Sequence, residues 1–366
     1  MIKVMQVMTD TNIGGAGIWL LNFLKYYDRE KLDVTVVIPE NSMLKDRILK
    51  LDVKIIEAPD IADRSFSKEG INTLKEIIAE ENPDVVHTHA SLSARIAAKL
   101  LKVPVINTRH CLEPRKNGVI RLIYRIINRA LSDRAVAVSE AVYDNLVSDG
   151  IPADKVSVIY NGVPPLKTLS NDERARVREE MGLTDTIAIG IVARLEPVKN
   201  HMLFLQAASA VYEINDKFRF VIVGDGSMKS ELKAEAERFG ISDAVIFTGY
   251  LEDTTDVMNA IDINVLTSDR EALSISLIEG MSVGKPCITT DAGGTREVVE
   301  NGKSGIVVPV GDAVNLTAAI LRLASDFELM SQYGAEGRKI AAEKFIPSVM
   351  CDKLADLYEE TAGKGE

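Results

Sequence analysis

Two carboxylates stand eight positions apart in the segment REALSISLIEGMSVGKP, which runs from Arg270 to Pro286. Glu271 precedes the apolar run of this segment, and Glu279 lies inside it. A carboxylate in apolar surroundings is costly unless hydrogen-bond donors satisfy it. The pair therefore indicates either a binding site that supplies such donors, or a surface loop charge and a helix residue that reaches solvent. The spacing alone does not separate these two interpretations.

The residues around the pair predict an anion site at the start of a helix. An apolar strand is expected at 263–266, a loop over 267–273, and then a helix with Ser274 as its N-cap. The backbone N–H groups of Leu273, Ser274 and Ile275 then lack helical partners, and such a helix start favours phosphate. With a carboxylate on either side, this arrangement suits a nucleoside diphosphate that carries a sugar.

Short apolar segments alternate with amphipathic helices along the whole chain, which is typical of parallel α/β sheets. Prolines at 164 and 165 interrupt this rhythm and mark a domain boundary. We therefore expect two Rossmann-like, doubly wound α/β domains, over 1–163 and 164–345, followed by a C-terminal segment, 346–366. Ligands should bind at the carboxyl ends of the strands, in a cleft between the domains. The strand candidates are 2–7, 34–38, 53–56, 85–87, 105–107, 135–138 and 156–159, then 187–192, 219–223, 245–247, 263–266, 286–289 and 305–308.

The composition excludes several classes of protein. The chain has 366 residues, of which 46% are hydrophobic and 27% charged, and its net charge at pH 7 is −11. This is an ordinary balance for a globular protein and lacks the basic excess of nucleic-acid binders, so we expect no nucleic-acid partner. The 3 cysteines are far apart in the sequence, which indicates reduced thiols. No apolar run has the length of a signal peptide or a membrane-spanning helix, so the expected location is cytoplasmic.

The segment SDREALSISLIEGMSVGKPCITTDAGGTREVVENGKSGIVVP resembles the signature region of glycosyltransferase family 4, whose members have the GT-B fold. Similar motifs recur along the chain, namely GGAG, DVVHTH, NTRH, VIYNGV, GIVARLEPVKNH and VIVGDGSMKSEL. The resemblance implies two Rossmann-like domains that face each other across a cleft, with a C-terminal helix that crosses back to the first domain. It also implies retaining transfer of a sugar from a nucleotide-diphosphate donor, with UDP favoured, to a hydroxyl acceptor such as a glycolipid or polysaccharide intermediate.

The resemblance assigns roles to residues of the second domain. Glu279 would hold the nucleotide ribose, and Glu271 would contact the donor sugar. Arg194 and Lys199 would grip the diphosphate, where fixed cations stabilise the negative charge that grows on the leaving group. The alternative for these two cations is that they are solvated surface charges. The walls of the pocket for the nucleotide base would include Gly224, Tyr250 and Leu251.

In the first domain, the resemblance implies that Gly15 approaches the donor phosphates or the acceptor, and that His110 lies beside the reacting sugar. A plain strand–helix turn and a structural histidine are the alternatives. A dinucleotide-binding loop would need the pattern G-x-G-x-x-G, and Leu20 stands where the last glycine would be. A dinucleotide-dependent oxidoreductase is therefore a distant alternative.

We expect neither a metal ion nor another cofactor. Asp262-Ile263-Asn264 is the nearest match to the D-x-D pair that holds a metal in many sugar-nucleotide enzymes, and it is more simply interpreted as the start of a strand. His87 and His89 would lie on one face of a strand, but a third ligand with suitable spacing is missing.

A basic amphipathic helix is predicted in RKNGVIRLIYRIINRALSDR, where Arg121, Arg125 and Arg129 recur every four residues and apolar side chains occupy other faces. Helices of this kind bind anionic membrane surfaces, so weak peripheral association with the inner face of a membrane is one expectation. An arginine stripe in solvent above the core of the domain is the alternative.

These observations predict a metal-independent, retaining glycosyltransferase with His110, Arg194, Lys199 and Glu271 at the reaction centre. Two other functions stay open. One is a hydrolase or epimerase that acts on a nucleotide sugar within the same fold, and the other is a non-catalytic protein that binds a nucleotide sugar.

Overall fold

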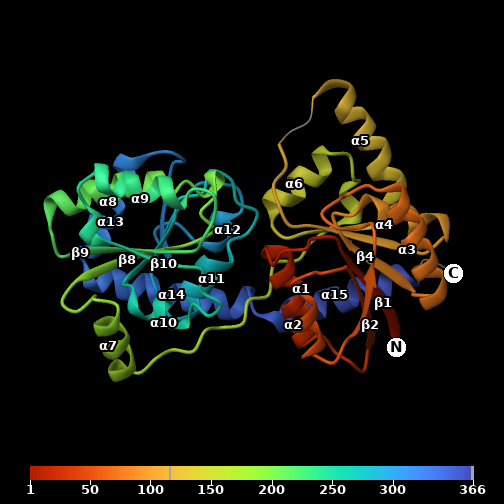
Figure 1. Cartoon of the computed structure of the whole chain (residues 1–366), viewed down its shortest axis with the longest axis horizontal. Coiled ribbons are helices and arrows are strands. Elements are labelled where there is room, and N and C mark those ends of the chain that lie inside the picture. The colour runs from red at the N-terminus through yellow and green to blue at the C-terminus, as the bar shows by residue number, and fades with distance from the viewer. Residues whose placement is uncertain (115–116, 364–366) are drawn as a thin grey trace. The chain divides into compact units, whose positions relative to one another are not determined.

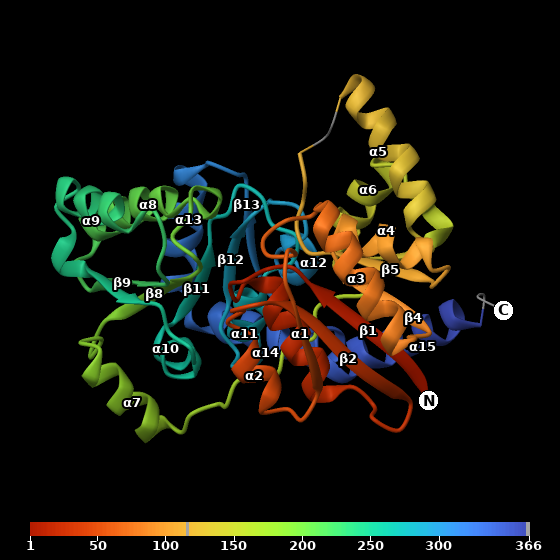
Figure 2. The ribbon, with the colours of Figure 1, turned by 45° about the vertical axis from the view of Figure 1, so that its right-hand side comes forward.

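A computed structural model describes residues 1–114 and 117–363, which form two compact units. The first unit joins Met1–Val163 to the C-terminal segment that starts at Phe345, and the second unit is Pro164–Lys344. The last three residues of the predicted segment 346–366 lie outside the described residues. In Figures 1 and 2, each unit is a sheet with helices on both of its faces.

The first unit is built on one parallel sheet. Its strands are β1 (Ile2–Met8), β2 (Leu32–Pro39), β3 (Lys54–Ala58), β4 (Val85–His89), β5 (Val105–Arg109), β6 (Arg134–Ala137) and β7 (Val156–Val158). The sheet is 7-stranded, in the order β3-β2-β1-β4-β5-β6-β7. The strand order reverses between β1 and β4, and ligands of doubly wound folds bind at the carboxyl ends of the strands on either side of such a switch point.

Helices cover both faces of the first sheet because its strands are apolar on both sides. The helices are α1 (Gly15–Tyr26), α2 (Lys45–Leu49), α3 (Lys68–Glu81), α4 (Leu92–Leu100), α5 (Gly118–Leu131), α6 (Glu140–Ser148) and α15 (Pro347–Ala362), with a 3-10 turn at Ala153–Lys155. Val4 of β1 packs in the core that contains residues of α1 and α15, and the next residue, Met5, packs in the core formed with α3 and α4. The predicted return of the C-terminal helix to the first domain is therefore correct.

The second unit repeats this plan. Its strands are β8 (Ile187–Val192), β9 (Phe218–Val223), β10 (Val245–Gly249), β11 (Ile263–Leu266), β12 (Cys287–Thr290) and β13 (Gly305–Val308). They form a 6-stranded parallel sheet in the order β10-β9-β8-β11-β12-β13, with its switch point between β8 and β11. Its helices are α7 (Asn171–Glu180), α8 (His201–Ile214), α9 (Lys229–Arg238), α10 (Thr255–Ala260), α11 (Ile275–Ser282), α12 (Thr295–Val298), α13 (Ala313–Ala324) and α14 (Phe327–Lys344), with 3-10 turns at Pro197–Lys199 and Ser242–Ala244.

The predicted fold class is confirmed. Each predicted strand is present, and its ends differ from the prediction by one or two residues at most. Within residues 1–114 and 117–363, no helix combines the length and the apolar character that a membrane crossing requires.

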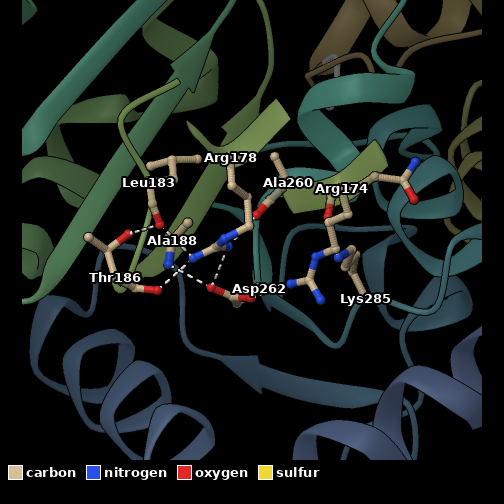
Figure 3. Close-up of polar contacts among 9 residues, drawn as sticks. Arg174, Arg178, Leu183, Thr186, Ala188, Ala260, Asp262 and Lys285 are labelled. Carbon is tan, nitrogen blue, oxygen red and sulfur yellow. Dashed lines mark hydrogen bonds and ion pairs between the residues drawn. The ribbon is translucent and has the colours of Figure 1, made fainter. Parts of the chain in front are cut away.

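A partly buried polar cluster fixes α7 to the second sheet (Figure 3). Arg178 donates to the main-chain oxygens of Leu183 (2.8 Å) and Thr186 (2.6 Å), and also to the Asp262 carboxylate (3.1 Å). Arg174 donates to the other Asp262 oxygen (2.6 Å), and the Ala188 N–H donates to Asp262 Oδ2 (2.9 Å). Asp262 is therefore a structural anchor at the amino end of β11.

Candidate functional site

Loops at the carboxyl edge of the second sheet are tied together by main-chain hydrogen bonds. Leu195 N–H in the loop after β8 donates to Asp225 O in the loop after β9 (3.0 Å). Asp269 N–H in the loop after β11 donates to Val198 O in the loop after β8 (2.9 Å). Glu271 N–H then donates to the loop after β12 (3.0 Å). These bonds form one connected rim around the switch point between β8 and β11.

Lys199 and Glu271 meet at this rim. The Lys199 ammonium forms an ion pair with Glu271 Oε2, and Ser268 Oγ donates to the same oxygen at 3.2 Å. The main chain at Lys199 is held by Thr267, whose Oγ1 donates to Lys199 O at 3.0 Å. The two charged side chains are only 18% and 12% exposed, so their attraction is stronger than that of a pair in open solvent. The structure thus places two residues predicted to bind the donor in direct contact.

Arg194 lies on the same loop as Lys199 and is exposed. Behind it, Gly224 follows β9 with a φ of 137°, a conformation that L side chains rarely adopt. A Cβ atom at Gly224 would lie 2.0 Å from Ala193 O, so only glycine allows the turn after β9 to pass so close to the Arg194 loop. Tyr250, which is 64% exposed, and Leu251 directly follow β10 on the same edge of the sheet.

Helix α11 begins as predicted, with Ser274 as its N-cap. Ser274 Oγ accepts a hydrogen bond from Leu277 N–H at 3.3 Å. The amides of Ile275 and Ser276 are in the first turn, where no helical carbonyl can reach them. The buried Leu273 and Ser274 lead into this turn, so these N–H groups are donors for an anion at the rim.

Glu279 is half-buried in the second turn of α11. Its Oε2 accepts a hydrogen bond from Thr254 Oγ1 at 3.1 Å. Burial raises the pKa of Glu279 to about 7, the Thr254 hydrogen bond opposes that rise, and the nearby negative charge of Asp253 adds to it. The carboxyl group therefore has unused hydrogen-bonding capacity, which the two hydroxyls of a ribose would match.

The two predicted site residues of the first unit follow β1 and β5. Gly15 begins α1, and a Cβ atom there would find no heavy atom within 4 Å, so the space beside its backbone is open within the described structure. His110 directly follows β5 and stacks on His89 of β4, with ring centroids 5.1 Å apart. Burial lowers the pKa of His110 to about 3, so its imidazole is neutral at physiological pH.

The partners of these residues are not predicted from the sequence. Thr254 contacts Glu279, and Gln6, His89 and Tyr358 connect to His110 through hydrogen bonds. A glutamine at the centre of the apolar strand β1 was a signal that could have indicated a buried polar network. Nothing in the local sequence of α15 indicates that Tyr358 joins it.

The residues considered for a metal site have other partners. Asp262 is held by two arginines and a main-chain amide, and it lies at the amino end of its strand. The ring nitrogens of His87 and His89 are hydrogen-bonded within the protein. In the part of the chain that the structure describes, no group of three or more His, Cys, Asp or Glu side chains could hold a metal ion.

The pKa of Glu279 predicts a measurable change in stability. A carboxyl group whose pKa is raised by folding contributes most below its unfolded pKa, near 4.5, and this contribution is lost as the pH rises through about 7. Glu279→Gln cannot ionise, so between pH 4.5 and pH 8 the free energy of unfolding should shift in favour of the variant by about 2–3 kcal/mol. Urea denaturation across this pH range measures the difference.

Glu343→Gln on α14 is the matched control, because Glu343 is exposed. Its stability should follow that of the unsubstituted protein at every pH. If Glu279→Gln and the unsubstituted protein have parallel pH profiles, the Glu279 carboxylate is not desolvated in the way described.

Comparisons with known proteins identify relatives of this chain. Residues 173–340 match the family model for glycosyl transferases group 1, and residues 13–165 match the model for glycosyltransferase family 4. The chain is 27% identical over 384 aligned positions to the Escherichia coli UDP-Gal:alpha-D-GlcNAc-diphosphoundecaprenol alpha-1,3-galactosyltransferase, with 98% of this chain and 96% of that protein covered. It is 26% identical to the Bacillus anthracis N-acetyl-alpha-D-glucosaminyl L-malate synthase, over 78% of this chain and 76% of that protein.

The crystal structure of Anabaena Alr3699/HepE in complex with UDP-glucose has the same fold, with a TM-score of 0.85 at 21% identity, covering 98% of this chain and 100% of that one. The two family models follow one another along the chain and together span both units. With its two Rossmann-like sheets and its rim of loops at the second switch point, the chain belongs to the glycosyltransferases of family 4 and has the GT-B fold.

Proposed function

We propose that this glycosyltransferase moves a hexose from a UDP-sugar to a hydroxyl acceptor, with retention of configuration at the anomeric carbon and without a metal ion. The observation that carries the proposal is the rim of the second unit. There, Lys199, Arg194 and Glu271 lie on loops that main-chain hydrogen bonds connect, and the first-turn amides and Glu279 belong to α11, the helix that follows one of these loops. A nucleotide diphosphate linked to a sugar offers a matching partner for each of these groups.

The cations and the helix start act on the diphosphate. As the bond between the anomeric carbon and the diphosphate oxygen breaks, negative charge grows on the leaving group. Lys199 and Arg194 stabilise that charge, and the N–H groups of Ile275 and Ser276 donate to the phosphate oxygens. Because Glu271 already holds Lys199 in place, the cation needs little reorganisation when the charge develops.

Glu279 accepts hydrogen bonds from the ribose hydroxyls, and Glu271 accepts from hydroxyls of the transferred sugar. Gly224, Tyr250 and Leu251 form walls for the base. In the first unit, Gly15 and His110 contact the phosphates and the reacting sugar. The acceptor hydroxyl attacks the face of the sugar from which the diphosphate departs, and a diphosphate oxygen takes the acceptor's proton, so that configuration is retained.

Metal independence follows from the charges that the protein itself supplies. Two cations and helix amides offset the diphosphate, which is the task that a metal performs in other sugar-nucleotide enzymes. The aspartate in the nearest approach to a D-x-D pair, Asp262, is already neutralised by Arg174 and Arg178.

The acceptor is proposed to be linked to a lipid, because α5 exposes an apolar face. Helices of globular proteins usually bury that face. In α5 the polar side turns inward instead: the buried Asn128 accepts from Arg95 (3.0 Å) and donates to Asp149 O (3.0 Å). Arg121 donates to Ser148 O (3.4 Å) and Arg125 lies against Gly150.

The opposite side of α5 faces solvent. Its exposed apolar side chains are Val119, Ile120, Leu122, Ile123 and Ile126, each between 49% and 73% exposed. An exposed apolar patch of this size marks an interaction surface. In Figures 1 and 2, α5 lies at the rim of the first unit, outside α4 and α6.

Positive charge borders this apolar face. Arg121, Arg125 and Arg129 are exposed. Apolar side chains flanked by arginines match an anionic lipid surface, where the first group enters the acyl region and the second contacts the headgroups. The alternative, an arginine stripe in solvent above the domain core, does not account for α5 as a whole, because the apolar face of α5 does not cover the core.

The first prediction from this function concerns the reaction itself. Incubation with UDP-hexoses and a lipid-linked sugar should release UDP and give a product with the anomeric configuration of the donor, as measured by NMR. Excess EDTA should leave the rate within about twofold, because no step uses a metal. An inverted product, or free sugar as the dominant product when acceptor is present, would refute the proposed transfer.

A second prediction concerns the phosphate clamp. Arg194→Ala and Lys199→Ala should each lower kcat/KM by about 10²–10³-fold, because each removes charge that stabilises the leaving diphosphate. Lys217→Ala, an exposed lysine before β9, is the matched control and should keep full activity. Turnover within a few-fold of normal in both site variants would show that the diphosphate binds elsewhere.

The third prediction concerns α5. The protein should float with vesicles that contain anionic phospholipid at low salt, and binding should weaken at high salt as charges are screened. Ile123→Asp should weaken this binding at least about tenfold, because it places a charge in the apolar face. Val314→Asp, at a residue of α13 that is 79% exposed, is the control and should bind normally. No flotation of the unsubstituted protein at low salt would exclude membrane docking.

A further inference from the structure

Three imidazoles stack at the carboxyl edge of the first sheet. His87 and His89 come from one face of β4, and their ring centroids are 4.8 Å apart. His110 continues the stack from the end of β5, 5.1 Å from His89. The buried ring of Trp19 on α1 lies against all three, at 4.8–5.6 Å between centroids. The stack therefore lies next to the switch point between β1 and β4.

The outer half of the stack is joined to β1 by hydrogen bonds. His110 Nε2 and His89 Nδ1 are 2.8 Å apart, and His89 Nε2 is 3.0 Å from Oε1 of Gln6. Gln6 is completely buried. His110 Nδ1, at the free end of this chain, is buried and has no hydrogen-bond partner among the residues that the structure describes.

The inner half leads to the C-terminal helix. Gln6 Nε2 donates to the hydroxyl of Tyr358 on α15 at 2.8 Å. The same hydroxyl is 2.6 Å from His87 Nδ1, and His87 Nε2 is 2.6 Å from Thr108 Oγ1. Hydrogen bonds thus connect Thr108 to His110 without a break.

The Gln6 amide determines which nitrogen of each imidazole carries hydrogen. Its Oε1 can only accept, so His89 Nε2 must carry a hydrogen. Desolvation lowers the pKa of His89 well below its usual value, so this ring is neutral and its Nδ1 is a lone pair. His110 Nε2 must then donate to that lone pair, and because His110 is also neutral, its own Nδ1 is left as an acceptor.

The hydrogen bonds of the inner half run in the same direction, from donor to acceptor, as those of the outer half. Gln6 Nε2 donates to the Tyr358 oxygen, so the Tyr358 hydroxyl can give its hydrogen to His87 Nδ1. His87 then donates through Nε2 to Thr108 Oγ1. Each group between the two ends of the chain, His110 and Thr108, is a donor on one side and an acceptor on the other, as a neutral network requires.

We propose that Gln6, His89 and Tyr358 are positioning residues that hold His110 as the neutral tautomer with hydrogen on Nε2 and a lone pair on Nδ1. This inference rests on the proposed function, in which His110 lies beside the reacting sugar. In this tautomer, His110 cannot present an N–H group at Nδ1, but it can accept a hydrogen bond from a hydroxyl of the substrate. Tyr358 thereby makes the C-terminal helix, more than 350 residues from Gln6, part of the site.

Nitrogen-15 NMR of the imidazoles tests the tautomer directly. The chain has only 4 histidines, and His201→Gln assigns the one outside the stack. At pH 7, the His110 signals should be those of a neutral ring with a protonated Nε2 and an unprotonated Nδ1. A proton on Nδ1, or a cationic His110, would overturn the proposal.

Variants separate positioning from simple structural support. Tyr358→Phe removes the acceptor for Gln6 Nε2, so the amide loses its preferred orientation and both tautomers of His110 should appear. The value of kcat should fall by about tenfold or more, with a smaller change in the donor KM. Thr108→Val is the control: it cuts the chain beyond His87, leaves the Gln6 amide oriented, and should keep the tautomer of His110 and the rate.

Two outcomes would reject the inference. One is a loss of kcat in Tyr358→Phe while His110 remains a single Nε2–H tautomer. The other is an equal loss in Thr108→Val. The NMR result does not depend on turnover, so a failure of the proposed transfer would leave the tautomer measurement valid, and the two failures are distinguishable.

Discussion

The ion pair of Lys199 and Glu271 is the contact around which the rim of the second unit is organised. It joins two loops that follow different strands. The loops are also connected by the main-chain bond from Asp269 N–H to Val198 O and by the bond from the Thr267 hydroxyl to Lys199 O. Desolvation opposes the burial of each charge, so a partly buried ion pair is retained only where geometry and further hydrogen bonds compensate. The parallel sheet meets this requirement, because the loops at its switch point leave the sheet side by side.

Glu279 is the second costly group at the same edge. Unlike Glu271, it has no cation, and one hydroxyl from Thr254 is the hydrogen bond that its carboxylate accepts in the described structure. The rise of its pKa to about 7 reflects that poor compensation. A structural role alone does not account for a carboxyl group in this position, whereas a polyhydroxyl ligand would supply the missing donors.

The buried polar groups at the switch point of the first unit are uncharged, unlike those of the second unit. These side chains are neutral imidazoles, an amide and hydroxyls, and they satisfy one another in a directed chain. Such a network tolerates burial well, because its members supply one another with donors and acceptors. This chain thus combines a charged rim on one unit with a neutral hydrogen-bonded network on the other.

The sequence by itself determined the two doubly wound sheets, the N-cap at Ser274 and the candidate residues of the rim. Each of these depends on local patterns: alternating apolar runs, a capping residue, and motifs placed directly after strands. It also indicated the amphipathic character of α5, because helical periodicity is a local property. Only the tertiary structure decided that the polar side of α5 faces the protein, that Thr254 contacts Glu279, and that Tyr358 reaches Gln6 and His87. These contacts join residues distant in the chain, and their geometry is set by how helices pack on sheets, which no local pattern specifies.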